Sequence, residues 1–247
     1  MPRRRGCRLV RATLILTAVD LEARALAREL ELPPLAGLPF PAFGRGAIRV
    51  APVGLRASRL AERWPALHAG LERPLVISAG VCAGLDPDLA VGDLVLPERI
   101  VAPGGRLLDV SPSDHRSAAA IPPSPATGRL ATTRDVVATL DAKAALFCET
   151  GAIAADMESA FIAEAAAAAG LPCLVVRAVS DAAQESLPPE LIRLVSPDGR
   201  VRLAAAASLL ARPALMSRAL GLRRAVAHAL RAVARRLAAL PSEPVRG

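Results

Sequence analysis

The pattern of hydrophobic and polar positions is clearest between residues 151 and 184, where it predicts a strand, a helix and a second strand. Residues 152–155 form a short apolar run, and residues 157–169 are rich in alanine and contain no helix breaker. A glycine and a proline then end the helix, and residues 173–179 form a β-branched apolar run of strand length. Such a run is typical of a strand that is buried on both faces of a parallel sheet.

Similar runs along the rest of the chain predict one α/β domain of ordinary size. We expect strands at residues 12–19, 47–53, 75–79, 94–96, 100–101 and 129–132, and helices at residues 20–31, 57–70 and 135–147. Residues 80–84 are expected to form a Gly-rich loop whose amides approach a sugar or an anion, with a plain turn as the alternative. Residues 103–128 lack periodicity and are expected to form a loop or lid.

The C-terminal region, residues 201–240, has a helical pattern that Pro213 interrupts, and it follows an expected turn at residues 198–199. Its last part carries an apolar stripe with helical spacing, formed by Leu222, Val226, Leu230, Val233 and Leu237. Arginines occupy the other side. We expect this stripe to pack on the protein; the alternative is an interfacial helix on anionic lipid.

Polar residues in the central segment stand only at the strand ends. Asp156 and Glu158 follow the first strand, and Ser180 and Asp181 follow the second. Ligands of open α/β sheets bind outside the carboxyl ends of strands, so this pattern predicts a site. Arg177 lies inside an apolar run and needs a carboxylate partner. The alternative is that the acidic residues merely cap helices and compensate helix dipoles.

Composition narrows the function. The chain has 247 residues, a formal net charge of +8 and only 2% aromatic residues, and Lys143 is its one lysine. The charge suggests nucleic acid, but the scarcity of aromatic side chains argues against base stacking, so no nucleic-acid partner is expected. The three histidines and the scattered cysteines show no zinc spacing, and no metal site is expected.

The expected compartment is the cytoplasm. Four cysteines without a paired motif indicate a reducing environment. The arginines near the N-terminus imitate a signal peptide, but further arginines interrupt the apolar stretch that follows, so residues 1–12 are interpreted as a loose basic tail. Peripheral contact with the inner membrane through the C-terminal helix is the alternative that the amphipathic stripe leaves open.

Four motifs in this order resemble the purine nucleoside phosphorylase superfamily, and most closely its methylthioadenosine/S-adenosylhomocysteine nucleosidases. They are Thr17-Ala18-Val19-Asp20-Leu21-Glu22, Ser78-Ala79-Gly80 with Val91-Gly92-Asp93, Asp156-Met157-Glu158 and Val176-Arg177-Ala178-Val179-Ser180-Asp181. The resemblance implies a three-layer α/β/α sandwich with a central mixed, mostly parallel sheet over residues 13–200, followed by a helical extension at 201–247. It further implies a homodimer that acts on a small-molecule nucleoside without a cofactor.

The resemblance also assigns roles. Asp181 would protonate N7 of the purine, and Ser180 would orient Asp181. Glu22 would activate the attacking water, and Arg177 and Glu158 would help to place that water. Glu158 would bind the ribose hydroxyls. The other residues that the resemblance implies at the substrate are Met157, Asp156, Ser180, Ala18, Gly80, Val81, Cys82, Val136 and Val137. The family often has an aromatic residue near position 136, and Val136 cannot stack on a base.

Whether water or phosphate attacks is the main alternative. Phosphorylases of the superfamily carry an anion-binding loop after the first strand, and here Glu22 stands in that region, which favours water. Arg24 keeps a phosphate co-substrate possible in principle. The basic C-terminal extension is similar to that of hopanoid-associated phosphorylases, which release adenine from an adenosyl-hopane lipid. A nucleoside-binding module without catalysis is the non-enzymatic alternative.

Overall fold

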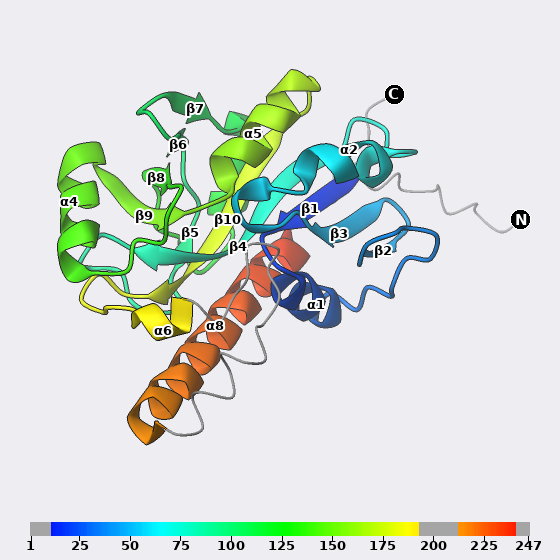
Figure 1. Ribbon diagram of the computed structural model, residues 1–247. Helices are drawn as coiled ribbons and strands as arrows, with labels where there is room; N and C mark the ends of the chain where they lie inside the picture. The colour runs from blue at the N-terminus through cyan, green and yellow to red at the C-terminus, as the bar shows by residue number, and fades with distance from the viewer. Residues whose placement is uncertain (1–10, 193–211, 241–247) are drawn as a thin grey trace, which may run out of the picture.

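The computed structural model describes residues 11–192 and 212–240, in which strands and helices alternate (Figure 1). The strands are β1 (Thr13–Thr17), β2 (Phe43–Arg45), β3 (Ile48–Pro52), β4 (Leu75–Gly84), β5 (Leu94–Val95), β6 (Arg99–Val101), β7 (Leu107–Asp109), β8 (Arg129–Thr132), β9 (Ala152–Asp156) and β10 (Cys173–Asp181). The helices are α1 (Asp20–Glu29), the 3₁₀ turn η1 (Leu55–Ala57), α2 (Leu60–His68), α3 (Pro112–Ala119), α4 (Leu140–Thr150), α5 (Ser159–Ala168), α6 (Pro189–Ile192) and α8 (Pro213–Ala239). Residues 1–10 of the expected tail and the expected turn at 198–199 lie outside the described residues.

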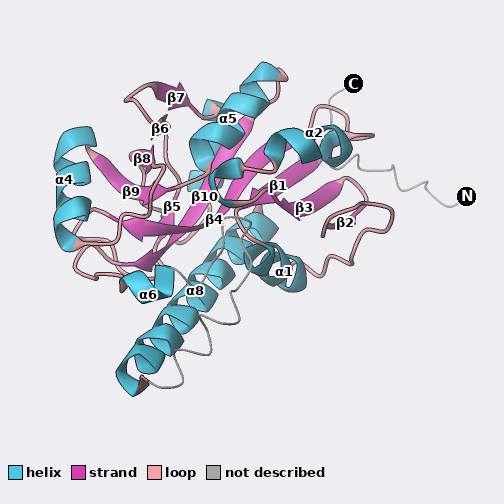
Figure 2. Cartoon of the chain, viewed as in Figure 1, coloured by secondary structure: helices cyan, strands magenta, loops and turns pink. Residues whose placement is uncertain are grey.

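The strands form one mixed sheet in the order β2-β3-β1-β4-β9-β8-β6-β7, and β10 pairs with β4 and β5. β1 is parallel to β3 and β4, and β10 is parallel to β4 along its length. β9 meets β4 in antiparallel fashion only near the carboxyl ends of both strands, where Ala83 pairs with Ala155. The carboxyl ends of β1, β4, β9 and β10 therefore converge in one part of the sheet (Figure 2).

Helices cover both faces of the sheet, which confirms the expected three-layer sandwich (Figure 1). Successive residues of a strand point to opposite faces, so Val175 and Leu174 of β10 enter different cores. The core around Val175 includes Ile162 of α5, and the core around Leu174 includes Leu26 of α1 and Val233 of α8. Aliphatic side chains make up most of both cores, and Phe43 is a buried aromatic member of the second.

The C-terminal helix α8 lies against β10, β4 and α1. Within the predicted apolar stripe, Leu230, Val233 and Leu237 are buried, whereas Leu222 and Val226 are half-buried. The expected packing of the stripe on the protein is therefore confirmed for its last three positions. Full burial of a Val or Leu side chain stabilises a fold by roughly 1.5–3 kcal/mol, so this end of α8 is part of the core.

Two of the predicted loops are not loops in the structure, so these two predictions are wrong. Residues 80–84 continue β4, because their backbone pairs with β10 and, at the end, with β9. Residues 103–128 contain β7, which pairs with β6, and α3, which buries Ala118. Arg11, at the end of the expected loose tail, forms an ion pair with Asp114 of α3. Helix α4 begins later than expected because the Thr139 side chain caps it, accepting a hydrogen bond from the Ala142 amide.

Candidate active site

The predicted polar residues gather where the carboxyl ends of β1, β4, β9 and β10 converge. Asp156 ends β9, Asp181 ends β10, and Glu22 lies in the first turn of the helix that follows β1. All three side chains are buried. The sequence pattern therefore predicted this convergence correctly, but the structure divides the residues between two buried cations rather than gathering them around one.

Arg177 is the first of these cations and is fully buried in β10. Its Nη2 atom lies 2.7 Å from Asp156 Oδ2 and 3.9 Å from Glu158 Oε2. The same nitrogen contacts the hydroxyl oxygens of Ser78, at 2.8 Å, and Ser159, at 3.2 Å. The predicted need of Arg177 for a carboxylate partner is thus met, and the two serine hydroxyls are site residues that sequence reasoning missed.

Asp156 fills both roles that the sequence left open. It pairs with Arg177, and its Oδ2 also accepts a hydrogen bond from the Ser159 amide at the start of α5, as a helix cap does. Thr132 donates to its other oxygen at 2.7 Å. With both oxygens bonded inside the protein, Asp156 positions Arg177 and α5, and its binding to a substrate stays a prediction.

Glu22 sits beside this cluster and is held by backbone amides. Its Oε2 accepts from the amide of Ala18 at 3.0 Å, and its Oε1 accepts from the amide of Val81 at 3.1 Å. A Cβ atom at Gly80 would lie 2.6 Å from Glu22 Oε1 and 2.7 Å from Arg177 Nη1, so only glycine lets β4 pass here. The close backbone approach expected at this glycine is real, although its neighbours are protein side chains.

The buried Arg177 cluster contains more carboxyl groups than positive charges. Burial raises the pKa of Glu22, and the nearby Arg177 only partly offsets this. The pKa of Glu158 rises to about 8, mainly through burial, against the attraction of Arg177 and with repulsion from Asp156. One oxygen of Glu158 accepts from the Arg56 amide at 3.0 Å. At neutral pH Glu158 therefore retains a proton, and the pKa of Glu22 lies above that of an exposed glutamate.

Lys143 of α4 is the second buried cation, and it holds Asp181. Its Nζ atom lies 2.6 Å from Asp181 Oδ2, and both side chains are almost fully buried. The Ser180 hydroxyl donates to Asp181 Oδ1 at 2.7 Å. Burial raises the pKa of Asp181, and the hydrogen bond from Lys143 opposes this rise. The expected orientation of Asp181 by Ser180 matches this geometry, whereas Lys143 was missed as a site residue.

The remaining predicted site residues lie around this edge in different environments. Cys82 is buried in β4, and burial raises the pKa of its thiol. Met157 is half-buried between Asp156 and Glu158. Val137 is half-buried near α4, and Val136 is 41% exposed. The contacts of these four residues with a nucleoside stay predictions.

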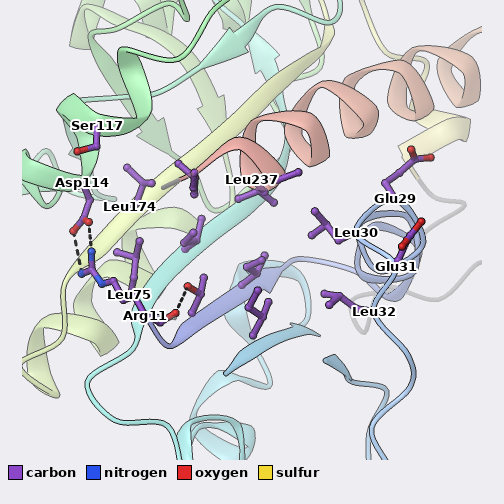
Figure 3. A pocket seen from close by; sticks show the side chains of 16 residues that line it. Arg11, Glu29, Leu30, Glu31, Leu32, Leu75, Asp114, Ser117, Leu174 and Leu237 are labelled. Atoms are coloured by element: carbon purple, nitrogen blue, oxygen red, sulfur yellow. Dashed lines mark hydrogen bonds and ion pairs between the residues drawn. The ribbon is translucent and has the colours of Figure 1, made fainter. Parts of the chain in front are cut away.

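A cavity of about 390 Å³ lies at the opposite edge of the sheet (Figure 3). Thr13, Leu75 and Leu174, at the amino ends of β1, β4 and β10, contribute to its lining, together with the C-terminal ends of α1 and α8. The Arg11–Asp114 ion pair stands at one side of it (Figure 3). None of the residues that line this cavity belongs to the site, so we do not connect it with the chemistry.

Two further findings concern the residues that the structure describes. Over residues 11–192 and 212–240, no three His, Cys, Asp or Glu side chains are arranged to hold a metal ion. Over the same ranges, no helix combines the length and the apolar character that crossing a membrane requires.

Comparisons with known proteins agree with this architecture. The family model described as "Phosphorylase superfamily" matches residues 66–212. Futalosine hydrolase of Streptomyces coelicolor is 34% identical over 207 residues, which cover 68% of this chain and 83% of that protein. A structure of a Helicobacter pylori MTAN variant with 5′-methylthioadenosine in its active site aligns with a TM-score of 0.67 and 20% identity, covering 90% of this chain and 94% of the other. Native H. pylori futalosine hydrolase aligns with a TM-score of 0.65 and 21% identity, covering 94% and 97%. The chain belongs to the phosphorylase superfamily.

Proposed function

We propose that this protein is a nucleosidase, an enzyme that uses water to cleave the N-glycosidic bond of a purine nucleoside. Membership of the phosphorylase superfamily and the 34% identity to a futalosine hydrolase support an N-glycosidase. One structural observation carries the proposal further. Two buried carboxyl groups, Glu22 and Asp181, stand at the same sheet edge, and burial raises the pKa of both.

Cleavage of a glycosidic bond builds positive charge on the sugar and negative charge on the leaving group. Asp181, whose raised pKa favours its protonated form, gives a proton to N7 of the departing base. Glu22 takes a proton from the attacking water, and its raised pKa makes its carboxylate a stronger base than that of an exposed glutamate. The protonated carboxyl group of Glu158 both donates and accepts hydrogen bonds, which suits contact with ribose hydroxyls.

The charges at the site favour water over phosphate as the nucleophile. Arg177 is the guanidinium at the centre of the cluster, and Asp156 already neutralises it. A phosphate dianion placed there would find no unpaired positive charge, and the ionised form of Glu22, which the proposed base requires, would repel it. Arg24 is engaged elsewhere, because its exposed side chain pairs with Asp20 at 2.7 Å and lies over the ring of Phe43.

The comparisons rank the substrates to be tested. The relative with 34% identity is named for futalosine, whereas the structures named for methylthioadenosine resemble this chain at about 20% identity. We therefore infer futalosine as the first substrate and methylthioadenosine or S-adenosylhomocysteine as the second. Adenosyl-hopane is the weaker alternative, since the last three positions of the α8 stripe are buried on the protein.

The test is to incubate the protein with each nucleoside, with and without phosphate, and to separate the products by chromatography. Release of the base together with a free sugar, independent of phosphate, is the expected result. Strict dependence on phosphate, with a sugar 1-phosphate as product, would make the protein a phosphorylase. Tight binding of a nucleoside without any turnover would support the binding module instead.

A further inference from the structure

Lys143 is the chain's one lysine among 31 basic residues, all the others being arginines. It is also among the few fully buried cations in the part of the chain described here, with 1% of its side chain exposed. The two cationic side chains are not interchangeable, because an ammonium is a compact charge with three donors and a guanidinium is a planar fork. A lysine at this one position therefore indicates a local requirement for an ammonium group.

The surroundings of the Lys143 ammonium meet that requirement. Its Nζ atom lies 2.6 Å from Asp181 Oδ2, 2.6 Å from the carbonyl oxygen of Ala182 and 2.9 Å from the carbonyl oxygen of Glu185. These three short contacts match the three protons of an ammonium, with the Asp181 carbonyl oxygen farther away at 3.5 Å, whereas a neutral amine would leave one of the three acceptors facing a lone pair. The geometry thus keeps the positive charge on Lys143, and Asp181 is the one acidic group among the three acceptors.

We propose that Lys143 is a positioning residue for the reaction proposed above. Its ammonium group fixes the proposed acid, Asp181, and stabilises the carboxylate that remains once Asp181 has given its proton to the departing base. This inference rests on the proposed function. An ammonium attracts a carboxylate more strongly than a neutral carboxylic acid, so the contact strengthens as the proton leaves, and only such contacts accelerate the chemical step.

Lys143 is the dominant influence among the charged and titratable groups that face Asp181. Ser180 donates to it from β10, and the buried thiol of Cys82 lies nearby in β4. Glu185, in the loop after β10, raises the pKa of Asp181 slightly by repulsion, as the last of the causes. Lys143 opposes the effect of burial and thereby makes Asp181 a stronger acid than burial alone would leave it.

The alternative is that Lys143 only anchors the loop after β10 through the two carbonyl oxygens. The pH dependence of kcat/KM separates the two roles. Loss of an adjacent opposite charge shifts a carboxyl pKa by about one to three units. Lys143→Met should therefore move the alkaline limb of the pH profile to higher pH by about that amount. The same variant should lower kcat, since the carboxylate left after proton transfer loses its partner. A merely structural role would lower activity without moving the limb.

Two further variants control this result. Lys143→Gln also removes the charge but keeps a donor for the loop carbonyls, and it should shift the limb in the same direction. Glu185→Gln changes the same loop, where the Glu185 side chain accepts from the Ala182 amide at 3.3 Å, without touching the ammonium. Since Glu185 raises the pKa of Asp181, neutralising Glu185 should shift the alkaline limb slightly to lower pH.

A measurement that needs no activity uses the fact that Lys143 is the single lysine. Protein labelled with ¹⁵N and ¹³C only in lysine gives one set of side-chain resonances. Titration of Asp181 should move the Lys143 signals in the wild-type protein, and Asp181→Asn should abolish that movement. The inference would be overturned if the Lys143 signals moved with pH in Asp181→Asn as they do in the wild-type protein. It would also be overturned if the alkaline limb of the pH profile stayed in place in both Lys143 variants. A wild-type protein that cleaves no nucleoside would overturn the proposed function instead, whatever the resonances show.

Discussion

Two buried cations stand at the same sheet edge and govern different carboxyl groups. Arg177 lies 2.7 Å from Asp156 and 3.9 Å from Glu158, with Glu22 nearby, so three carboxyl groups share one positive charge. Lys143 faces the single carboxylate of Asp181 at 2.6 Å. In the first cluster the excess of carboxyl groups favours retention of a proton, whereas in the second the one-to-one pairing favours its release. The contrast supports the proposal that water and sugar bind on the Arg177 side and that the base leaves on the Lys143 side.

Removing the carboxyl group on the Lys143 side should have the largest effect. Asp181→Asn keeps the shape of the side chain but cannot supply the proton, and loss of general acid catalysis costs roughly a hundredfold to ten-thousandfold in rate. Base release measured by absorbance gives the rate, and circular dichroism checks the fold. Turnover close to that of the wild type would remove Asp181 from the mechanism.

Removing the cation on the other side should affect stability. Arg177→Met leaves buried carboxyl groups without their cation, and breaking a buried pair in this way costs about 3–5 kcal/mol. Urea unfolding measures the loss. Arg24→Met is the matched control, because the Arg24–Asp20 pair is exposed. If both variants unfolded at the same urea concentration, Arg177 would not be the centre of a buried cluster.

Glu158 should make the stability of the protein depend on pH. Its pKa is about 8 in the folded protein, against 4.5 as the ordinary value, so the folded state binds a proton that the unfolded state has already lost. Stability should therefore fall as pH rises from about 5 to about 8, by at most about 1.4 kcal/mol per pH unit for this one group. Glu22, whose pKa is also raised, acts in the same direction.

The variant that tests this is Glu158→Gln, which cannot titrate. Unfolding free energies measured between pH 5 and pH 8 should fall less steeply for this variant than for the wild type. Parallel curves for the two proteins would show that Glu158 is already ionised in the fold, and the contrast between the two clusters would then lose its basis.

Arg24 should show the smallest effect. It lies outside both clusters, and an exposed ion pair such as Arg24–Asp20 contributes about 0–1 kcal/mol. Arg24→Met should therefore change neither kcat/KM nor the response to phosphate by more than a few-fold. A large loss of activity confined to phosphate buffer would identify Arg24 as part of an anion site.

Sequence patterns predicted one cluster better than the other, for a physical reason. Asp156 and Glu158 lie at or just beyond the end of the apolar strand β9, Arg177 lies within the apolar strand β10, and the carboxyl ends of both strands converge at β4. Lys143 lies in α4, 38 residues before its partner Asp181 in the chain. The helix pattern does not show which group a lysine side chain will contact. The one available signal was its uniqueness among arginines.

The errors in the fold have similar causes. Residues 80–84 contain two glycines and read as a loop, but pairing with both β10 and β9 holds them as strand. Residues 103–128 lack periodicity because β7 is a short edge strand, paired with β6 alone among the described strands. Tertiary pairing of this kind outweighs local preference, and it leaves no trace in the spacing of apolar residues.

In the proposed reaction, water activated by Glu22 at the Arg177 cluster attacks a nucleoside whose base leaves from the Asp181 side. The most direct measurement is to run the reaction on futalosine and on methylthioadenosine in phosphate buffer, in water labelled with a heavy oxygen isotope, and to weigh the sugar product by mass spectrometry. We expect a free sugar that carries one heavy oxygen atom. A sugar 1-phosphate without the label, or intact nucleoside after long incubation with folded protein, would contradict it.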